Sequence, residues 1–159
     1  MLKGSILLFA IVVSSCAFAG DSNCFANSAA YMQAKYGDAY RHDENIVIKK
    51  VRYGTQIFYS ASDTTSGTNS PRTLLIQMPG KGLCKVLDTP PIATLQALKY
   101  DKQGRPIAFI SREQGNPSLE ITYVWARASR KFAPTTCNEI TWVNDNAVSE
   151  SVPCNDWVE

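Results

Sequence analysis

The sequence predicts an α+β protein in which one N-terminal helix packs on a curved antiparallel sheet of about eight or nine short strands, a meander of hairpins. Three observations lead to this fold class. Apolar residues recur at helical spacing near the start of the chain. Short alternating apolar runs with turn residues between them follow. The composition, 45% hydrophobic and 19% charged in 159 residues, is typical of one globular domain.

The first 19 residues read as an export signal. Lys3 supplies a positive charge, residues 5–13 form an uncharged apolar run, and Ala17-Phe18-Ala19 is a small-x-small cleavage pattern. Cleavage there leaves residues 20–159 as a single disulfide-stabilised domain. The apolar run is too short for a transmembrane helix, which needs about 20 residues, and no later stretch approaches that length.

A bacterial lipobox is the alternative interpretation of the same segment. Val13-Ser14-Ser15-Cys16 resembles one, and it would make Cys16 a lipid anchor. We favour ordinary cleavage, because Ala19 stands at a suitable distance from the apolar run and because a folded helix is expected soon after it.

The remaining cysteines are even in number, as expected for a disulfide framework in an exported protein. They are Cys24, Cys84, Cys137 and Cys154. Three connectivities are open; we favour Cys137–Cys154, closing a polar C-terminal loop, and Cys24–Cys84, tying the helix to the sheet. Zinc is disfavoured because no C-x-x-C pair occurs. A periplasmic or secreted location follows.

The helix is expected to begin at Asp21 or Ser22 and to end at Gly37. Its apolar stripe consists of Phe25, Ala29, Met32 and Tyr36. The expected strands then lie at residues 46–51, 56–59, 74–78, 83–87, 95–100, 106–111, 119–127, from 131, and 140–143. Glycine or proline turns join the first three pairs, at 53–54, 79–82 and 101–104. Alternation predicts that the side of the long strand at 119–127 bearing Leu119, Ile121, Tyr123 and Trp125 faces the helix.

Charge and composition exclude some function classes. A net charge of +2 without a concentrated basic surface argues against a nucleic-acid partner, and a single histidine excludes a multi-histidine metal site. No cofactor is expected.

Catalytic candidates are weak. His42 beside Asp43 and Glu44 could act as a general base, but the segment has the composition of a solvated linker. No G-x-S-x-G motif supports a serine nucleophile among residues 62–70. No spacing singles out a pair among the carboxylates, which are Asp63, Asp88, Asp101, Glu113 and Glu120.

Two features indicate a binding surface. Residues 60–70 form a long polar stretch that we expect to be a protruding loop, and a basic group near Trp125 could bind an anionic partner. Charge-protected edge strands are the competing interpretation of that group and of Lys49, Lys50 and Arg52. The candidate surface consists of Ser62, Asp63, Thr65, Gly67, Asn69, Arg127, Arg130 and Lys131.

The sequence therefore favours an exported, non-catalytic protein-binding module, of the kind found among inhibitors and toxin-immunity proteins. Such a protein covers the cleft of its partner with a loop or a sheet surface. Deleting residues 67–70 is expected to leave folding nearly intact and to weaken binding. The alternatives are a lipid or small-molecule carrier, a structural subunit of an envelope assembly, and a small hydrolase that uses His42.

Overall fold

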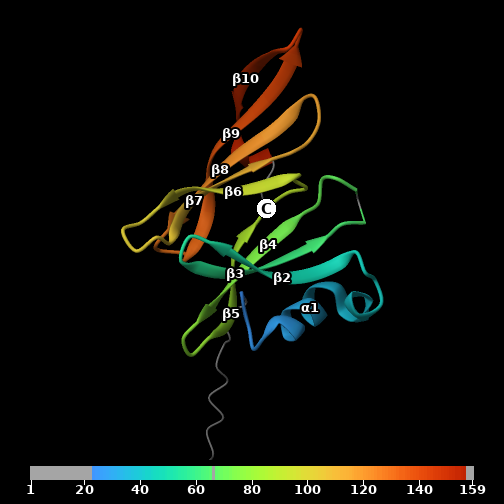
Figure 1. Cartoon of the computed structure of the whole chain (residues 1–159), viewed down its shortest axis with the longest axis vertical. Helices are drawn as coiled ribbons and strands as arrows, with labels where there is room; N and C mark the ends of the chain where they lie inside the picture. Colours follow the sequence, from blue (N-terminus) through green and yellow to red (C-terminus); the bar gives the residue numbers. More distant parts are fainter. Residues whose placement is uncertain (1–22, 66, 157–159) are drawn as a thin grey trace, which may run out of the picture.

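The computed structural model describes residues 23–65 and 67–156. Within these residues it contains two five-stranded antiparallel sheets and one short α-helix (Figure 1). The predicted signal peptide and Cys16 lie outside the described residues. The antiparallel strands and the single helix agree with the prediction in outline, but the single curved sheet is wrong.

The first sheet has the order β1-β5-β4-β3-β2. Its strands are β1 (Cys24–Phe25), β2 (Ile46–Tyr53), β3 (Gln56–Asp63), β4 (Arg72–Met78) and β5 (Gly82–Asp88). The second sheet is a meander with the order β10-β9-β8-β7-β6. Its strands are β6 (Thr94–Tyr100), β7 (Pro106–Arg112), β8 (Ser118–Ala126), β9 (Lys131–Val143) and β10 (Asn146–Val152).

The helix α1 (Ser28–Tyr36) covers one face of the first sheet, and the 3-10 turn η1 (Gly37–Arg41) follows it. It begins later than predicted, because the Asn27 side chain rather than Asp21 or Ser22 caps it, accepting the Ala30 N–H at 2.9 Å. Phe25 is not helical; it lies in β1 and pairs with Leu83 of β5. Gly37 ends the helix as expected, with φ of 60°.

The main core lies between the two sheets and is built from side chains of both. Leu119, Ile121 and Tyr123 are buried there, so they face the first sheet; the prediction that they face the helix is wrong. The physical reason is that the first sheet is apolar on both faces. One face receives Tyr31 and Met32 of α1, and the other is available to a second sheet.

The strand β10 was not predicted from the sequence. The predicted strand at 140–143 is the end of the 13-residue β9, and a two-residue turn at Asn144 and Asp145 leads into β10. Both turn residues have positive φ, 48° and 62°, as a type I′ hairpin turn requires.

The two disulfides are Cys24–Cys84, which joins β1 to β5, and Cys137–Cys154, which joins β9 to the 3-10 turn η2 (Cys154–Asp156). These are the two pairs that we favoured from the sequence. However, the first joins two paired strands rather than the helix and the sheet, and the second closes the β9–β10 hairpin rather than a loop. The disulfides indicate an oxidising compartment such as the periplasm or the cell exterior. In the described part of the chain, no helix has the length and apolar character needed to cross a membrane.

Candidate functional site

The predicted binding loop at residues 60–70 is largely part of the folded body. Ser60 and Ser62 are buried in β3, so Ser62 is not available as a surface contact. Asp63 ends the strand, and its carboxylate accepts hydrogen bonds from the Thr65 backbone N–H at 3.0 Å and hydroxyl at 2.5 Å. The Thr65 hydroxyl, with the backbone N–H, lowers the pKa of Asp63. Thr65 and Gly67 are exposed.

Asn69 fixes the rest of this loop to the second sheet. Its side-chain amide donates to the Gln114 carbonyl at 2.8 Å and accepts the Gln114 N–H at 2.8 Å. Next to it, Ser70 is buried and pairs with Ile92 through two backbone hydrogen bonds of 3.0 and 3.1 Å. The loop thus ties the two sheets together at one end, and deleting residues 67–70 would remove this connection.

A second connection joins the sheets at their other end, between the β2–β3 and β6–β7 turns. The Thr55 N–H donates to the Gly104 carbonyl at 2.9 Å, and the Thr55 hydroxyl donates to the Gln103 carbonyl at 2.8 Å. Gly54 permits this approach: its φ is 57°, and a Cβ atom there would lie 2.1 Å from the Gly104 oxygen.

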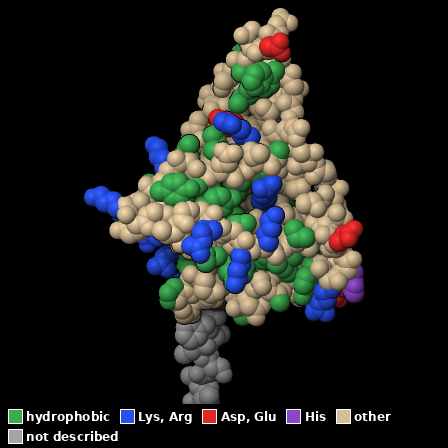
Figure 2. Space-filling model, viewed as in Figure 1, with side chains coloured by type: hydrophobic (Ala, Val, Ile, Leu, Met, Phe, Trp, Pro, Cys, Tyr) green, Lys and Arg blue, Asp and Glu red, His purple; other side chains and the backbone are tan. Residues whose placement is uncertain are grey.

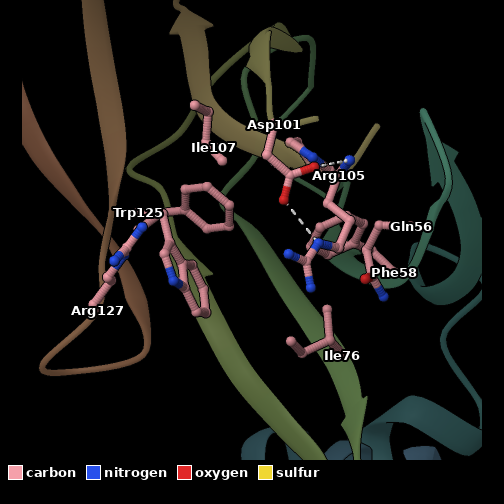
Figure 3. A pocket seen from close by; sticks show the side chains of 10 residues that line it. Gln56, Phe58, Ile76, Asp101, Arg105, Ile107, Trp125 and Arg127 are labelled. Atoms are coloured by element: carbon pink, nitrogen blue, oxygen red, sulfur yellow. Dashed lines mark hydrogen bonds and ion pairs between the residues drawn. The ribbon is translucent and has the colours of Figure 1, made fainter. Parts of the chain in front are cut away.

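A pocket of about 330 Å³ opens beside this second connection, between the two sheets (Figure 3). The first sheet contributes Gln56 and Phe58 from β3 and Ile76 from β4. The second sheet contributes the remaining lining residues, which are Asp101, Arg105, Pro106, Ile107, Trp125, Arg127 and Phe132. The volume is at the small end of the range for ligand pockets, about 300–1,000 Å³.

Of the predicted basic group, only Arg127 lines the pocket; Arg130 and Lys131 do not. The sequence had placed Arg127 near Trp125, and the structure brings both to one wall. The sequence could not indicate the opposite wall of the pocket, because Ile76 and Phe58 belong to the other sheet.

The β9–β10 hairpin projects from the body of the molecule (Figure 1). Figure 2 shows hydrophobic side chains exposed along it. Trp142, Val143 and Val148 of this hairpin are each more than half exposed. Both ends of β9 in this hairpin are held: the disulfide fixes Cys137, and the Asn116 side chain bonds the Trp142 backbone at 2.9 and 3.1 Å. The projection is therefore a supported strand pair.

The predicted catalytic groups do not form a site. His42 is exposed and lines a shallow hollow with Asp43 and Glu44. The Asp43 carboxylate accepts hydrogen bonds from the backbone and side-chain nitrogens of Asn45, each at 2.9 Å. Among the described residues the His42 side chain makes no hydrogen bond, so nothing orients it as a base.

The candidate carboxylates are bound separately. Asp88 pairs with Lys85 at 2.6 Å and Glu120 with Arg112 at 2.6 Å, while Asp101 stabilises its own turn. Within the described residues, no group of three or more His, Cys, Asp or Glu side chains could hold a metal ion.

Sequence reasoning missed Trp142 and Val148, which are among the most exposed apolar residues of the described chain. The signal was the turn: Asn144-Asp145 is a two-residue turn sequence directly after the strand predicted at 140–143. No protein-family model matches the chain, and comparison with curated proteins and with solved structures gives no match. The function must therefore be argued from these sites.

Proposed function

We propose that this chain is an exported protein-binding module that recognises an extended segment of its partner by strand addition to β10. This retains the function class expected from the sequence, including inhibitor-like or immunity-like action, and moves the contact surface from residues 60–70 to the β9–β10 hairpin. The open outer edge of β10 is the observation that carries the proposal.

The β10 edge lacks the usual protection against pairing. β10 pairs with β9 along all seven of its residues without a register shift, and no described strand pairs with its other side. It contains no lysine, arginine or proline, its one charged residue is Glu150, and six of its residues are exposed. Natural edge strands are normally blocked by charge, proline or bulges.

The β2 edge of the first sheet illustrates such protection. Lys49 and Lys50 are exposed there, with the Lys50 amine 5.5 Å from the centre of the Tyr59 ring. Figure 2 shows Lys and Arg side chains gathered over this part of the molecule. The contrast with β10 supports the view that β10 is left open for a partner.

Charges on the hairpin suggest what the partner segment carries. Glu150 of β10 lies directly opposite Glu139 of β9, and no described cation pairs with either. Like charges placed opposite each other destabilise a strand pair, and a basic side chain beside them would relieve the repulsion. Val148 follows on the same face as Glu150. The expected segment therefore presents a basic residue beside Glu150 and an apolar residue beside Val148.

Capture of the partner, followed by reconstitution with the purified partner, tests this proposal. We would compare the wild type with Glu150→Lys and Val148→Lys. Leu98→Lys is the matched control, because Leu98 is 48% exposed on β6, the opposite edge of the same sheet. Each β10 variant should weaken affinity about tenfold or more, whereas the control should not.

Three outcomes would contradict the proposal. The tagged protein could elute alone, or the partner could bind the β10 variants and the wild type equally. In the third outcome, sedimentation shows a concentration-dependent dimer that Val148→Lys abolishes, which would assign the edge to a second copy of this chain.

A further inference from the structure

The pocket between the sheets is separate from the proposed strand-addition site. Trp125 and Phe132 lie beside the β8–β9 turn, whereas Trp142 and Val148 lie at the opposite end of the second sheet. Partner binding to β10 makes no use of the pocket, so its role can be argued and tested independently.

The pocket walls are aromatic and rigid. Phe132 packs edge-to-face against Trp125, with ring centroids 5.0 Å apart, and against Phe109 at 4.8 Å; Phe109 in turn packs against Phe58 at 5.8 Å. Phe58 and Phe132 are buried. Because each ring rests on the next, none can turn to fill the space without losing a contact. The cavity is therefore preformed.

Two exposed arginines, Arg105 and Arg127, line this space. In the view of Figure 3, Trp125 lies between Arg105 on one side and Arg127 on the other. Asp101 holds Arg105 in place: its carboxylate accepts the Arg105 Nε at 2.8 Å and the N–H groups of Gln103 and Arg105 at 2.9 and 2.8 Å. The backbone N–H of Arg105, with these other contacts, lowers the pKa of Asp101.

Arg127 and Trp125 keep unused donors. Among the described residues, the Arg127 guanidinium makes no hydrogen bond or ion pair, and the indole N–H of Trp125 makes no hydrogen bond. Asp101 is already paired with Arg105, so the lining carries one net positive charge. A planar anion suits a free guanidinium, which can donate two parallel hydrogen bonds to a carboxylate.

We propose that the pocket binds a small carboxylate with an apolar body, aromatic or acyl. At about 30 Å³ for each water-sized group, the pocket volume of about 330 Å³ has room for about eleven non-hydrogen atoms. The apolar body packs on Trp125 and Ile76, the carboxylate accepts hydrogen bonds from Arg127, and the ion-paired Arg105 borders the other side.

Titration calorimetry with two probes of suitable size tests this proposal. Octanoate represents the acyl class and 3-phenylpropionate the aromatic class; octanamide and 3-phenylpropionamide are their uncharged counterparts. The carboxylates should bind with a Kd of about 1 mM or tighter, and the amides about tenfold more weakly. The tighter of the two carboxylates identifies the class of body that the pocket prefers.

Matched variants locate the carboxylate. Arg127→Gln should weaken carboxylate binding about tenfold and leave amide binding unchanged, because only the anion uses the guanidinium. Arg130→Gln removes the same charge from the same turn, outside the pocket lining, and should have no effect. Trp125→Ala should weaken both ligand types. Arg127 is exposed and unpaired, so thermal unfolding of Arg127→Gln should match that of the wild type.

Several results would overturn the proposal. The wild type could give no binding heat with either carboxylate at about 1 mM. The amides could bind as tightly as the acids, or Arg130→Gln could weaken binding as much as Arg127→Gln, which would indicate a general effect of charge.

Discussion

The loop between β3 and β4 and the β9–β10 hairpin both contain serine, threonine and asparagine residues, yet their backbones are used in opposite ways. In the loop, the Thr64 N–H donates to the Asn45 carbonyl at 3.0 Å, Ser70 pairs with Ile92, and Asn69 binds Gln114. In the hairpin, β10 uses one side for β9 and leaves the other unpaired within the described chain.

This difference shows that polarity alone does not identify a binding segment. Serine, threonine and asparagine serve equally well in a loop that joins two sheets and in a strand exposed to a partner. What distinguishes the two regions is whether the rest of the chain satisfies their backbone groups. By that criterion the loop is a structural connection, whereas the outer edge of β10 is left open within the described chain, as our proposal requires.

Removing the disulfides should have the largest effect on stability. The two removals should also affect the two regions differently. Cys24→Ser with Cys84→Ser, which opens a loop of 60 residues, should lower the free energy of unfolding by about 4 kcal/mol. Cys137→Ser with Cys154→Ser, with a separation of 17, should lower it by about 3 kcal/mol. Urea unfolding measures both.

Hydrogen exchange completes the comparison of the two disulfide variants. Only loss of Cys137–Cys154 should speed the exchange of β10 amides, since this bridge fixes the base of the hairpin. Equal acceleration of β10 in both variants would show that the bridge does not support the hairpin selectively.

Asn69→Ala should lower stability less than the loss of either disulfide, because it removes contacts of the β3–β4 loop alone. It removes both hydrogen bonds to the Gln114 backbone and should lower the free energy of unfolding by about 1–2 kcal/mol. Thr68→Ala, at an exposed neighbouring position, is the control and should change stability little. A neutral Asn69→Ala would mean that the loop is not a connection between the sheets.

The pH dependence of Asp63 should be the smallest effect. Its folded-state pKa lies below the ordinary value of 3.8, so its contribution to stability is complete above that value and is lost as pH falls through the lowered pKa. Titration of the Asp63 carboxyl by NMR measures this directly. Thr65→Val should raise the pKa part of the way back, while Thr64→Val should leave it unchanged, because the Thr64 hydroxyl bonds Asn45. An unaltered pKa in Thr65→Val would contradict this assignment.

Local features of this fold could be predicted from the sequence. The turns at Gly54, Gly80 and Gly104 were expected, and all three glycines have positive φ. Both favoured disulfide pairs, Cys137–Cys154 and Cys24–Cys84, form. The end of the helix at Gly37 could also be predicted, because glycine readily adopts the positive φ found there.

The remaining features depend on tertiary packing. Alternation showed that Leu119, Ile121 and Tyr123 share a buried side, but not whether a helix or a second sheet covers it. The pocket could not be predicted, because its Trp125 wall and its Ile76 wall belong to different sheets. The polar β10 lacks the apolar run by which strands are recognised, so only its turn signalled it.

Hydrogen exchange of the wild type with and without its purified partner is the most direct test of strand addition to β10. We expect slower exchange of β10 amides in the complex and unchanged exchange at residues 64–65 and 67–70. Protection of these loop residues without protection of β10 would contradict strand addition, because the partner would then contact the loop and not the open edge of the hairpin.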